Sequence, residues 1–467
     1  MQAIQKTFVL LLLLLANVHC TVHAQFYTKQ NKIWKFGRNT GISFATGVPV
    51  PVSSAIYTDE GCAAVGDTSG NMLFYTQGDS IWNRNDVVMP NGAGLVPFSC
   101  NSTSQAAVIV PVIGTTTKYY VFSLEHILAS GCLAYSIVDM SLDGGLGDVP
   151  VATRGLPIDS GFTEKMVAVR GNCCIWLLVH KADSAKFYAY KITASGINFT
   201  PVISSVGVYP NYHGYGVIKI SPNRTKLALT HFELTADTSR TELYDFNANT
   251  GIVSNCRILN TYSNPYGAEF SPNSSKLYVH HWTYGKLLQY DITGTTAGAI
   301  KATEYVVASS LTIGSDMRLG PDSNIYFSSN HSYLDRINDP NNSGSACNYT
   351  SNTIDLGAGT CILGLPPVYW SDTACPTGAP LIADAVQQLL VYPNPANSII
   401  NIIVPGKGNC NIQLLDMTGR VWVTTTGAAE NHTTLSTDGI PDGQYVVRAD
   451  AADGTIFRTT IVVHKNR

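Results

Sequence analysis

Short apolar stretches separated by turn residues run along most of the chain. They are rich in Val, Ile, Leu, Tyr and Phe, and clusters of Gly, Pro, Asn, Asp and Ser lie between them, as where Ala63–Asp67 turns at Thr68–Gly70 into Met72–Tyr75. Apolar runs with such breakers at close spacing are typical of β-strands joined by tight turns. The pattern therefore predicts an all-β protein.

One part of this pattern repeats. The segment Ser221–Leu229 returns as Ser271–Val279 and, more loosely, as Gly320–Phe327, and the prolines in their second positions lie 50 and 49 residues apart. After each of the first two copies comes another strand that ends in an aromatic residue and Asp, at Tyr244 and Tyr290. This spacing indicates a repeating unit of four short strands.

A unit of this size is too small to bury both faces of its sheet alone. A ring of such units, each packed between two neighbours, supplies the missing core, and that is the architecture of a β-propeller. Residues 25–370 are therefore predicted to form a β-propeller of about seven four-stranded blades, with six or eight blades as the alternatives.

Residues 389–467 carry a second series of short strands. The β-branched segment Ser398–Val404 ends at a Pro-Gly pair, and further turns follow at Met417–Arg420 and Ile440–Gly443. About seven strands at this spacing predict a small Ig-like β-sandwich. Residues 371–388 are the predicted linker between the two domains.

This last domain carries several short motifs in a fixed order. Their residues are Tyr392, Pro393, Asn394, Pro395, Asp416, Gly419, Arg420, Gly443 and Tyr445. With them the domain resembles the type A C-terminal sorting domain of the Bacteroidetes type IX secretion system. The resemblance implies passage through the periplasm, export by the type IX secretion machinery, proteolytic removal of the domain, and either release or attachment to surface lipopolysaccharide. An ordinary terminal Ig-like domain would share the strands but not the motifs.

The start of the chain also predicts export. Lys6 precedes nine apolar residues, Phe8–Ala16, and the small residue Ala24 stands before Gln25. These features indicate a signal peptide over residues 1–24, cleaved between Ala24 and Gln25. No later stretch approaches the roughly 20 apolar residues that a membrane-spanning helix requires, so no transmembrane segment is predicted.

The charge content of the chain argues against two classes of binding partner. Only 13% of residues are charged and the formal net charge is −3, which leaves no basic stripe for nucleic acid and no polybasic patch for a membrane surface. Gly, Pro and Tyr are abundant, as a large β-rich body requires. We therefore expect that the protein does not bind nucleic acid and does not insert into a membrane.

Ten of the eleven cysteines remain after signal cleavage, an even number in a compartment where disulfides persist. Cys347 and Cys361 are 14 residues apart, a spacing that suits a disulfide across one loop, whereas the adjacent Cys173 and Cys174 are not expected to bond each other. The cysteines and histidines show no zinc-site spacing, so no metal and no cofactor is predicted.

Candidate catalytic motifs each have a structural explanation. Gly78-Asp79-Ser80 resembles an esterase motif but sits where a hairpin turn is expected. His280 and His281 are adjacent on a strand and should point to opposite faces, one packed and one exposed. Asp339–Gly344 has oxygen ligands for Ca²⁺ but lacks the register of a calcium loop. No catalytic residue is assigned.

The predicted propeller, residues 25–370, also resembles a known group of proteins. Trp34–Gly37, Asp59–Cys62 and Met89–Gly92 make it similar to the propeller region of large Bacteroidetes surface proteins, which implies location and architecture but no functional residue. Aromatic residues beside turns are candidate anchors for a ligand: Tyr209, Tyr212, Tyr215, Trp282 and Tyr284. The sequence predicts a secreted or surface-displayed propeller that binds a protein or glycan and is more a binding protein than an enzyme. The alternative is a secreted hydrolase or lyase with its active site at the propeller channel.

Overall fold

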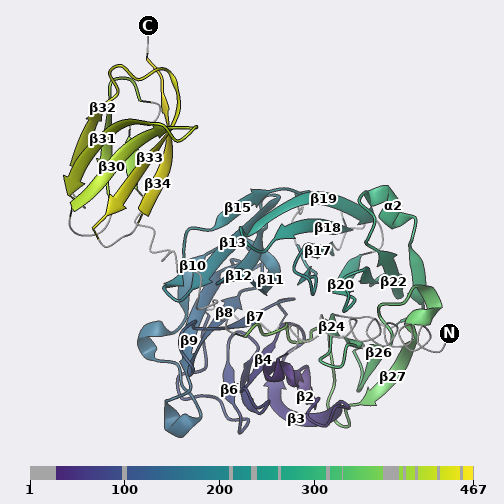
Figure 1. Ribbon diagram of the computed structural model, residues 1–467. Coiled ribbons are helices and arrows are strands. Elements are labelled where there is room, and N and C mark those ends of the chain that lie inside the picture. Colours follow the sequence, from purple (N-terminus) through teal and green to yellow (C-terminus); the bar gives the residue numbers. More distant parts are fainter. Residues whose placement is uncertain are drawn as a thin grey trace, which may run out of the picture. The chain divides into compact units, whose positions relative to one another are not determined.

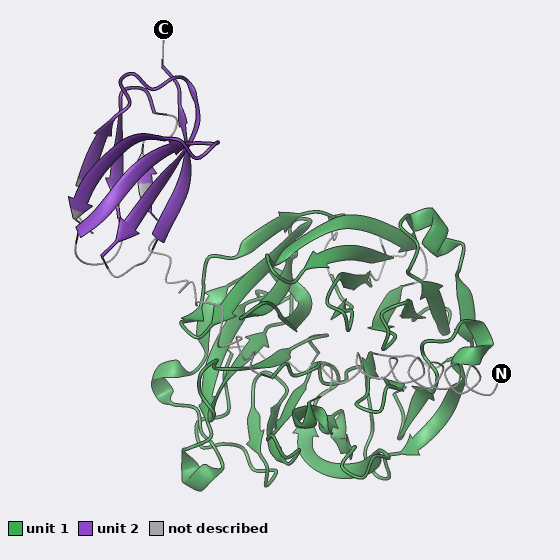
Figure 2. Ribbon diagram, viewed as in Figure 1, with its two compact units in different colours: residues 1–375 green, residues 376–467 purple. Residues whose placement is uncertain are grey.

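The chain forms two compact units that are built almost entirely from antiparallel strands. The computed structural model describes residues 28–96, 102–209, 214–232, 239–260, 264–311, 316–328, 330–371, 389–392, 396–404, 409–428, 432–452 and 456–465. The units are residues Met1–Cys375 and Pro376–Arg467 (Figure 2). Among the described residues, no helix is long and apolar enough to cross a membrane.

The first unit is a ring of small antiparallel sheets (Figure 1). Of the nine sheets in the described chain, two belong to the second unit and seven to the first. The inner strand of each sheet contacts the inner strand of the next, which is the arrangement of a β-propeller. The predicted propeller of about seven blades is confirmed, and we number the blades 1 to 7 in chain order.

Four blades have the predicted four strands in the described residues, blades 1 and 2 have three, and blade 4 has five. Blade 1 comprises β1 (Ile33–Phe36), β2 (Arg38–Ser43) and β3 (Val50–Tyr57); blade 2 comprises β4 (Ala63–Gly66), β5 (Met72–Thr76) and β6 (Ile81–Asn83); blade 3 comprises β7 (Ala107–Pro111), β8 (Lys118–Leu124), β9 (Leu133–Asp139) and β10 (Leu156–Asp159). Blade 4 comprises β11 (Phe162–Arg170), β12 (Ile175–Lys181), β13 (Lys186–Thr193), β14 (Gly196–Ile197) and β15 (Val202–Ser205); blade 5 comprises β16 (Ile218–Ile220), β17 (Lys226–His231), β18 (Arg240–Asn247) and β19 (Ile252–Asn260).

Blade 6 comprises β20 (Pro265–Phe270), β21 (Lys276–His281), β22 (Lys286–Asp291) and β23 (Tyr305–Ala308); blade 7 comprises β24 (Met317–Leu319), β25 (Ile325–Ser328), β26 (Tyr333–Ile337) and β27 (Tyr349–Asp355). Short helices precede or connect some of these strands: η2 (Lys29–Asn31), η3 (Asp143–Gly145), η4 (Val151–Thr153), α2 (Ala297–Lys301) and η6 (Gly344–Cys347). In most blades the strands follow chain order from the centre of the ring outward.

The sequence repeat corresponds to the turn between the first and second strands of blades 5, 6 and 7. Arg224, Ser274 and Ser323 occupy equivalent positions in this turn, with φ of 60°, 61° and 68°. In blades 5 and 6 the lysine two positions further on pairs with an aspartate of the third strand: Lys226 with Asp245 at 2.5 Å and Lys276 with Asp291 at 2.6 Å. The repeated residues therefore specify one hairpin geometry.

The ring closes where blade 1 packs between blades 2 and 7. The indole of Trp34 meets the ring of Tyr326 edge-on, with centroids 5.7 Å apart. The backbones of Arg38 and Thr360 also pair, which ties the end of the unit to its first sheet. Strands inside the ring are covered on both faces, and β12 is buried from Ile175 to His180. This double burial explains its continuous apolar run.

The second unit is a sandwich of two sheets. One sheet has the order β28 (Leu390–Tyr392), β29 (Ile399–Ile403), β32 (His432–Ser436); the other has the order β31 (Val421–Ala428), β30 (Asn409–Asp416), β33 (Gly443–Ala451), β34 (Ile456–Val463). Alternate residues such as Ile412, Leu414 and Val447 are fully buried in the core between them. The predicted Ig-like domain of about seven strands is confirmed.

The predicted Cys347–Cys361 disulfide is wrong. Cys347 is a free, buried thiol at the end of η6, and the thiol of Cys361 lies 3.1 Å from the carbonyl oxygens of His331 and Tyr333. Strand β27 runs between the two cysteines, and the six steps of roughly 3.3 Å along its seven residues hold its ends about 20 Å apart. Cys174 is also a free thiol, so it does not bond Cys173, as predicted.

Candidate functional site

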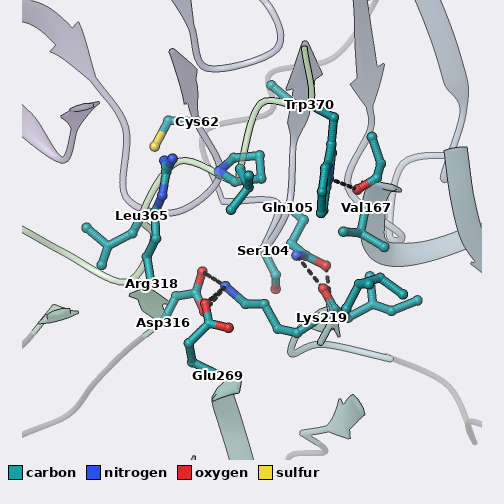
Figure 3. Close-up of a pocket in the computed structure, with 17 residues that line it drawn as sticks. Cys62, Ser104, Gln105, Val167, Lys219, Glu269, Asp316, Arg318, Leu365 and Trp370 are labelled. Carbon is teal, nitrogen blue, oxygen red and sulfur yellow. Dashed lines mark hydrogen bonds and ion pairs between the residues drawn. The ribbon is translucent and has the colours of Figure 1, made fainter. Parts of the chain in front are cut away.

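The central channel of the propeller contains a small, charged cavity. Its volume is about 40 Å³, and Figure 3 shows Lys219 pointing toward Asp316 and Glu269 within it. The Lys219 Nζ atom lies 2.9 Å from Asp316 and 4.0 Å from Glu269, and it donates to the carbonyl oxygen of Met317 at 2.7 Å. Because a water molecule needs about 10–15 Å³ of such space, the cavity has room for a few waters only.

The last segment of the first unit helps to fill this channel. Trp370 donates from its indole nitrogen to the carbonyl oxygen of Ala168 at 2.8 Å, and Arg318 donates to the carbonyl oxygen of Pro366. Burial raises the pKa of Asp316, and it raises the pKa of Glu269 to about 7 although the charge of Lys219 opposes the shift. The channel interior therefore holds buried ion pairs rather than an open pocket.

A second polar network joins residues at the start of the inner strands of several blades to His126, which lies between β8 and β9. The Tyr266 hydroxyl donates to Glu60 at 3.0 Å, and Ser104 donates to Glu164 from its backbone nitrogen at 3.0 Å and from its hydroxyl at 3.2 Å. The Nε2 atom of His126 lies 3.1 Å from Glu164. We call these five residues the carboxylate network.

Both carboxyl groups of this network are withdrawn from solvent. Glu164 is fully buried and Glu60 is 8% exposed. Burial raises the pKa of Glu164 to about 7, although hydrogen bonds from Ser104 oppose the shift. Burial, followed by the charge of Glu164, raises the pKa of Glu60 well above its usual range. Each carboxyl group thus keeps its proton to a higher pH than an exposed glutamate does.

A chain of aromatic rings connects to this network. Tyr266 contacts Trp282 at a centroid distance of 5.7 Å, and Phe232 contacts Trp282 at 5.2 Å and Tyr266 at 6.1 Å. Tyr215 extends the chain from Phe232, at 6.2 Å, to His126, at 5.9 Å. The chain links loops and strands of blades 3, 5 and 6.

Trp282, which packs on Tyr266 and Phe232, also lines a groove between blades 6 and 7. Its first part has a volume of about 560 Å³ and is lined by Trp282, Thr283, Tyr284, Gly285, Ser310, Leu311, Asn330 and His331. Its second part, of about 210 Å³, shares three of these residues and adds Phe327, Asp335, Tyr349, Ser351 and Asn352. We call the two parts together the blade 6–7 groove.

Backbone geometry shapes this groove. The hairpin that carries Trp282 and Tyr284 turns at Gly285, whose φ is 51°. Its backbone carbonyl accepts a hydrogen bond of 2.9 Å from the nitrogen of Leu311, and a Cβ atom here would lie only 2.4 Å from the Leu311 oxygen. Glycine is therefore required for this close approach of the two loops.

The predicted aromatic anchors fall into different places. Trp282 and Tyr284 line the groove together, and Tyr284 is 58% exposed. Tyr215 belongs to the aromatic chain, whereas Tyr209 is 47% exposed on a segment whose backbone accepts hydrogen bonds from Arg240 at 2.9 Å. Tyr212 lies outside the described residues.

The other sequence candidates are structural. His280 and His281 point to opposite faces of β21 as predicted, but both are fully buried, so the expectation that one is exposed is wrong. The neighbouring blades cover both faces of this strand: His280 packs on Phe327 at 5.1 Å, and His281 lies 3.0 Å from Asn260. Ser80 lies between β5 and β6, in the turn predicted for it.

Sequence reasoning missed much of the groove and of the carboxylate network. Ser310, Leu311, Asn330 and His331 come from loops of two blades, and Glu60 and Glu164 are separated by 104 positions. A polar residue at a loop carries no signal of its partners in other blades. Within the described chain no three His, Cys, Asp or Glu side chains are grouped so that they could hold a metal ion.

The sorting motifs of the second unit form a connected turn. Asp416 ends β30, and its carboxylate accepts hydrogen bonds from the Thr418 backbone at 2.9 Å, the Arg420 backbone at 3.1 Å and the Trp422 indole at 3.1 Å. Gly419 has a φ of 89° in this turn. Hydrogen bonding, first from the Thr418 side chain, lowers the pKa of Asp416 to about 2.

Of the other residues predicted for sorting and signal cleavage, some lie in or near this turn, some lie on other strands, and some belong to segments that the structure does not describe. Arg420 stacks on Trp422 at 4.7 Å, and the Trp422 ring contacts Tyr445 at 6.3 Å. Tyr392 ends β28 and Gly443 begins β33. Pro393, Asn394, Pro395, Ala24 and Gln25 lie outside the described residues.

Comparison with protein families identifies the second unit. Residues 390–463 match the secretion system C-terminal sorting domain. The unit is therefore the sorting domain of type IX secretion, and the chain is an exported protein of the cell surface or the medium that interacts with the type IX machinery. No curated protein sequence matches the chain.

Solved structures are similar to the chain at low identity. Hydrazine synthase of Kuenenia stuttgartiensis is 13% identical, over 67% of this chain and 94% of that one, with a TM-score of 0.39. Hsv2 of Kluyveromyces lactis is 9% identical, over 66% and 90%, with a TM-score of 0.37. Regucalcin of Agrobacterium tumefaciens, a calcium-binding protein, is 13% identical, over 64% and 81%, with a TM-score of 0.35.

Proposed function

We propose that the chain is an exported binding protein whose propeller holds a protein or glycan ligand in the blade 6–7 groove, while the sorting domain acts in export. The observation that carries the proposal is Tyr284, a large aromatic side chain that is 58% exposed at the edge of the groove. Asn330 and His331 line the same groove, and their side chains make no hydrogen bond or ion pair within the described part of the chain. An aromatic surface beside uncommitted polar groups is typical of a recognition site.

The dimensions of the groove support a ligand rather than a single ion. Its first part, at about 560 Å³, is within the range of about 300–1,000 Å³ of small-molecule sites. Trp282 is fixed at one end because it packs against Phe232 and Tyr266. Side chains that are already ordered lose little conformational entropy when a ligand binds them.

The alternative is a hydrolase or lyase with its active site at the channel. Glu164, with its pKa near 7 and with His126 at 3.1 Å, would be the candidate acid or base. Full burial of Glu164 and a channel cavity of about 40 Å³ give a substrate little access, so we favour binding.

Two proteolytic cleavages would convert the exported chain into its mature form. Cleavage after Ala24 and again within residues 371–388 would leave the propeller, residues 25–370, released or attached to surface lipopolysaccharide. Cys173 is disulfide-bonded, which suits passage through an oxidising periplasm. The intact mass of the exported protein, recovered from a Bacteroidetes host, would identify both cleavage sites.

Photo-crosslinking tests the binding role. The full chain would carry a photoreactive benzoylphenylalanine at Ser310, in the groove, or at Tyr57, which is 54% exposed on the outer strand of blade 1. Each protein is irradiated with a cell-envelope extract. We expect a crosslinked species at position 310 that is absent at position 57. Equal capture at both positions, or none at position 310, would reject the groove as the binding site.

A further inference from the structure

We propose that the ligand of the blade 6–7 groove is an uncharged oligosaccharide, with one sugar ring stacked on Tyr284 and its hydroxyl groups bonded to the polar lining. This inference rests on the proposed binding function and gives the ligand a chemical class. Three properties of the lining support it: its charge, its aromatic surface and its free hydrogen-bonding groups.

The lining carries almost no net charge. Asp335 is the one carboxylate among the described lining residues, and it is already committed, because it accepts hydrogen bonds from the Tyr349 hydroxyl at 2.5 Å and the Asn352 backbone at 2.7 Å. It is also only 4% exposed. The described lining contains no lysine or arginine. A phosphate, a sulfate or a nucleic acid would require cationic partners here, so the lining favours an uncharged ligand.

The aromatic side chains offer a surface for the apolar face of a sugar ring. Tyr284 projects at the edge of the groove, with Lys286 Nζ at 5.9 Å from its ring centroid. Trp282 stands beside it, and its indole nitrogen donates to no residue that the structure describes. A sugar ring has C–H groups on its face and hydroxyl groups at its edge. It can therefore contact an aromatic ring and accept from an indole N–H at the same time.

The rest of the lining is rich in small polar groups. Ser310, Asn330, Ser351 and Asn352 provide hydroxyl and amide groups that donate or accept hydrogen bonds. The Thr283 hydroxyl already accepts from the Asn264 amide at 3.0 Å and keeps its own hydrogen to donate. Leu311 and Phe327 contribute apolar side chains to the same lining. A peptide helix needs a continuous apolar groove for its apolar face, whereas here hydroxyl and amide side chains interrupt the apolar surface. A hydroxyl-rich ligand satisfies it better.

The test is binding of the full exported chain to an array of neutral and acidic oligosaccharides, followed by titration calorimetry with the neutral oligosaccharide that binds best. We compare the wild type with Tyr284→Ala, Tyr284→Phe and Asn330→Ala, and with Tyr57→Ala as the matched exposed-tyrosine control. We expect Tyr284→Ala to weaken binding at least ~10-fold, which is about 1.4 kcal/mol. Tyr284→Phe and Tyr57→Ala should bind like the wild type, and all variants should keep the wild-type Tm.

Two results would overturn the inference. One is binding to none of the neutral oligosaccharides, and the other is an equal loss of affinity in the Tyr284→Ala and Tyr57→Ala proteins. The crosslinking experiment separates this failure from failure of the proposed function. If position 310 still captures a species and protease treatment of the extract abolishes the capture, the groove binds a protein and only the saccharide inference fails. If periodate, which cleaves sugar diols, abolishes the capture, the inference is supported.

Discussion

The hydroxyl group of Tyr266 donates a hydrogen bond of 3.0 Å to Glu60, a residue 206 positions earlier in the chain. Tyr266 lies on β20 of blade 6, and Glu60 precedes β4 of blade 2. The same tyrosine ring contacts Trp282, which lines the groove. One side chain therefore joins the carboxylate network to the candidate binding groove.

Tyr266→Phe should destabilise the propeller without disturbing its packing. The substitution removes one hydroxyl and leaves Glu60 buried with fewer partners, since its Oε2 atom has no hydrogen-bond partner among the described residues. A lost hydrogen bond of this kind costs about 1–3 kcal/mol. Thermal unfolding measures the loss, and Tyr305→Phe, at a tyrosine that is 41% exposed, is the control. An unchanged Tm for Tyr266→Phe would show that the bond contributes nothing.

The raised pKa of Glu164 predicts a pH-dependent stability. Its folded pKa, about 7, lies above its ordinary value of 4.5, so the folded state binds the proton more tightly than the unfolded state. This contribution is complete below pH 4.5 and is lost as the pH rises through 7. Glu164→Gln cannot ionise, so its Tm minus that of the wild type should increase from pH 5 to pH 8.

The comparison must be a difference because buried histidines act in the opposite direction. Burial lowers the pKa of His231 to about 4, so its contribution to stability is lost as the pH falls below 6.5 toward 4. His231 is present in both proteins and cancels in the difference. A difference that stays constant between pH 5 and pH 8 would contradict the assignment of the titration to Glu164.

Lys219→Met should be among the most destabilising substitutions in the channel. It leaves Asp316 and Glu269 buried without their cation, and breaking a buried pair from one side costs about 3–5 kcal/mol. Adding Asp316→Asn should recover part of the loss because one of the stranded charges is removed. Chemical denaturation followed by tryptophan fluorescence measures both variants.

A matched control for Lys219 lies in the repeat turn of blade 5. Lys226 pairs with Asp245 at 2.5 Å, but the two side chains are 28% and 31% exposed. An exposed pair contributes about 0–1 kcal/mol, so Lys226→Met should cost much less than Lys219→Met. Equal losses in the two variants would mean that burial does not set the strength of these ion pairs.

The fold was largely predictable because its information is local. The Ser-Pro-Asn turn that recurs at Ser221 and Ser271 fixes a hairpin by its own side chains: Asn223 accepts from the Thr225 backbone at 3.1 Å and Asn273 accepts from the Ser275 backbone at 3.0 Å. Such contacts lie within a few residues and leave a pattern that repeats with the blade. The motifs of the sorting domain were readable for the same reason.

The candidate site was only partly predictable because its contacts cross blades. Trp282 and Tyr284 were visible as aromatic residues in one turn, but His331 joins them only because blade 7 packs beside blade 6. The Cys347–Cys361 disulfide failed for a related reason. A separation of 14 residues suggested proximity, while the strand between the two cysteines holds them apart.

Asp416→Ala should impair export, because this carboxylate organises the turn of the sorting domain. Its four hydrogen bonds, two of them from Thr418, hold the turn in which Arg420 stacks on Trp422. Since hydrogen bonding lowers the pKa of Asp416 to about 2, the carboxylate stays ionised as an acceptor at the pH of the periplasm. Without it the turn loses its fixed geometry, and the secretion machinery meets a different surface.

Fractionation in a Bacteroidetes host with a working type IX system measures this effect. We expect the Asp416→Ala chain to accumulate in the periplasm, as should a chain that ends at Asp372 and lacks the sorting domain. Asp450→Ala is the matched control, because Asp450 pairs with Arg448 at 2.9 Å on the neighbouring strand and lies outside the turn. If Asp416→Ala reached the surface or the medium as well as Asp450→Ala does, recognition would depend on the sandwich as a whole. The Asp416–Arg420 turn would then have no separate part in sorting.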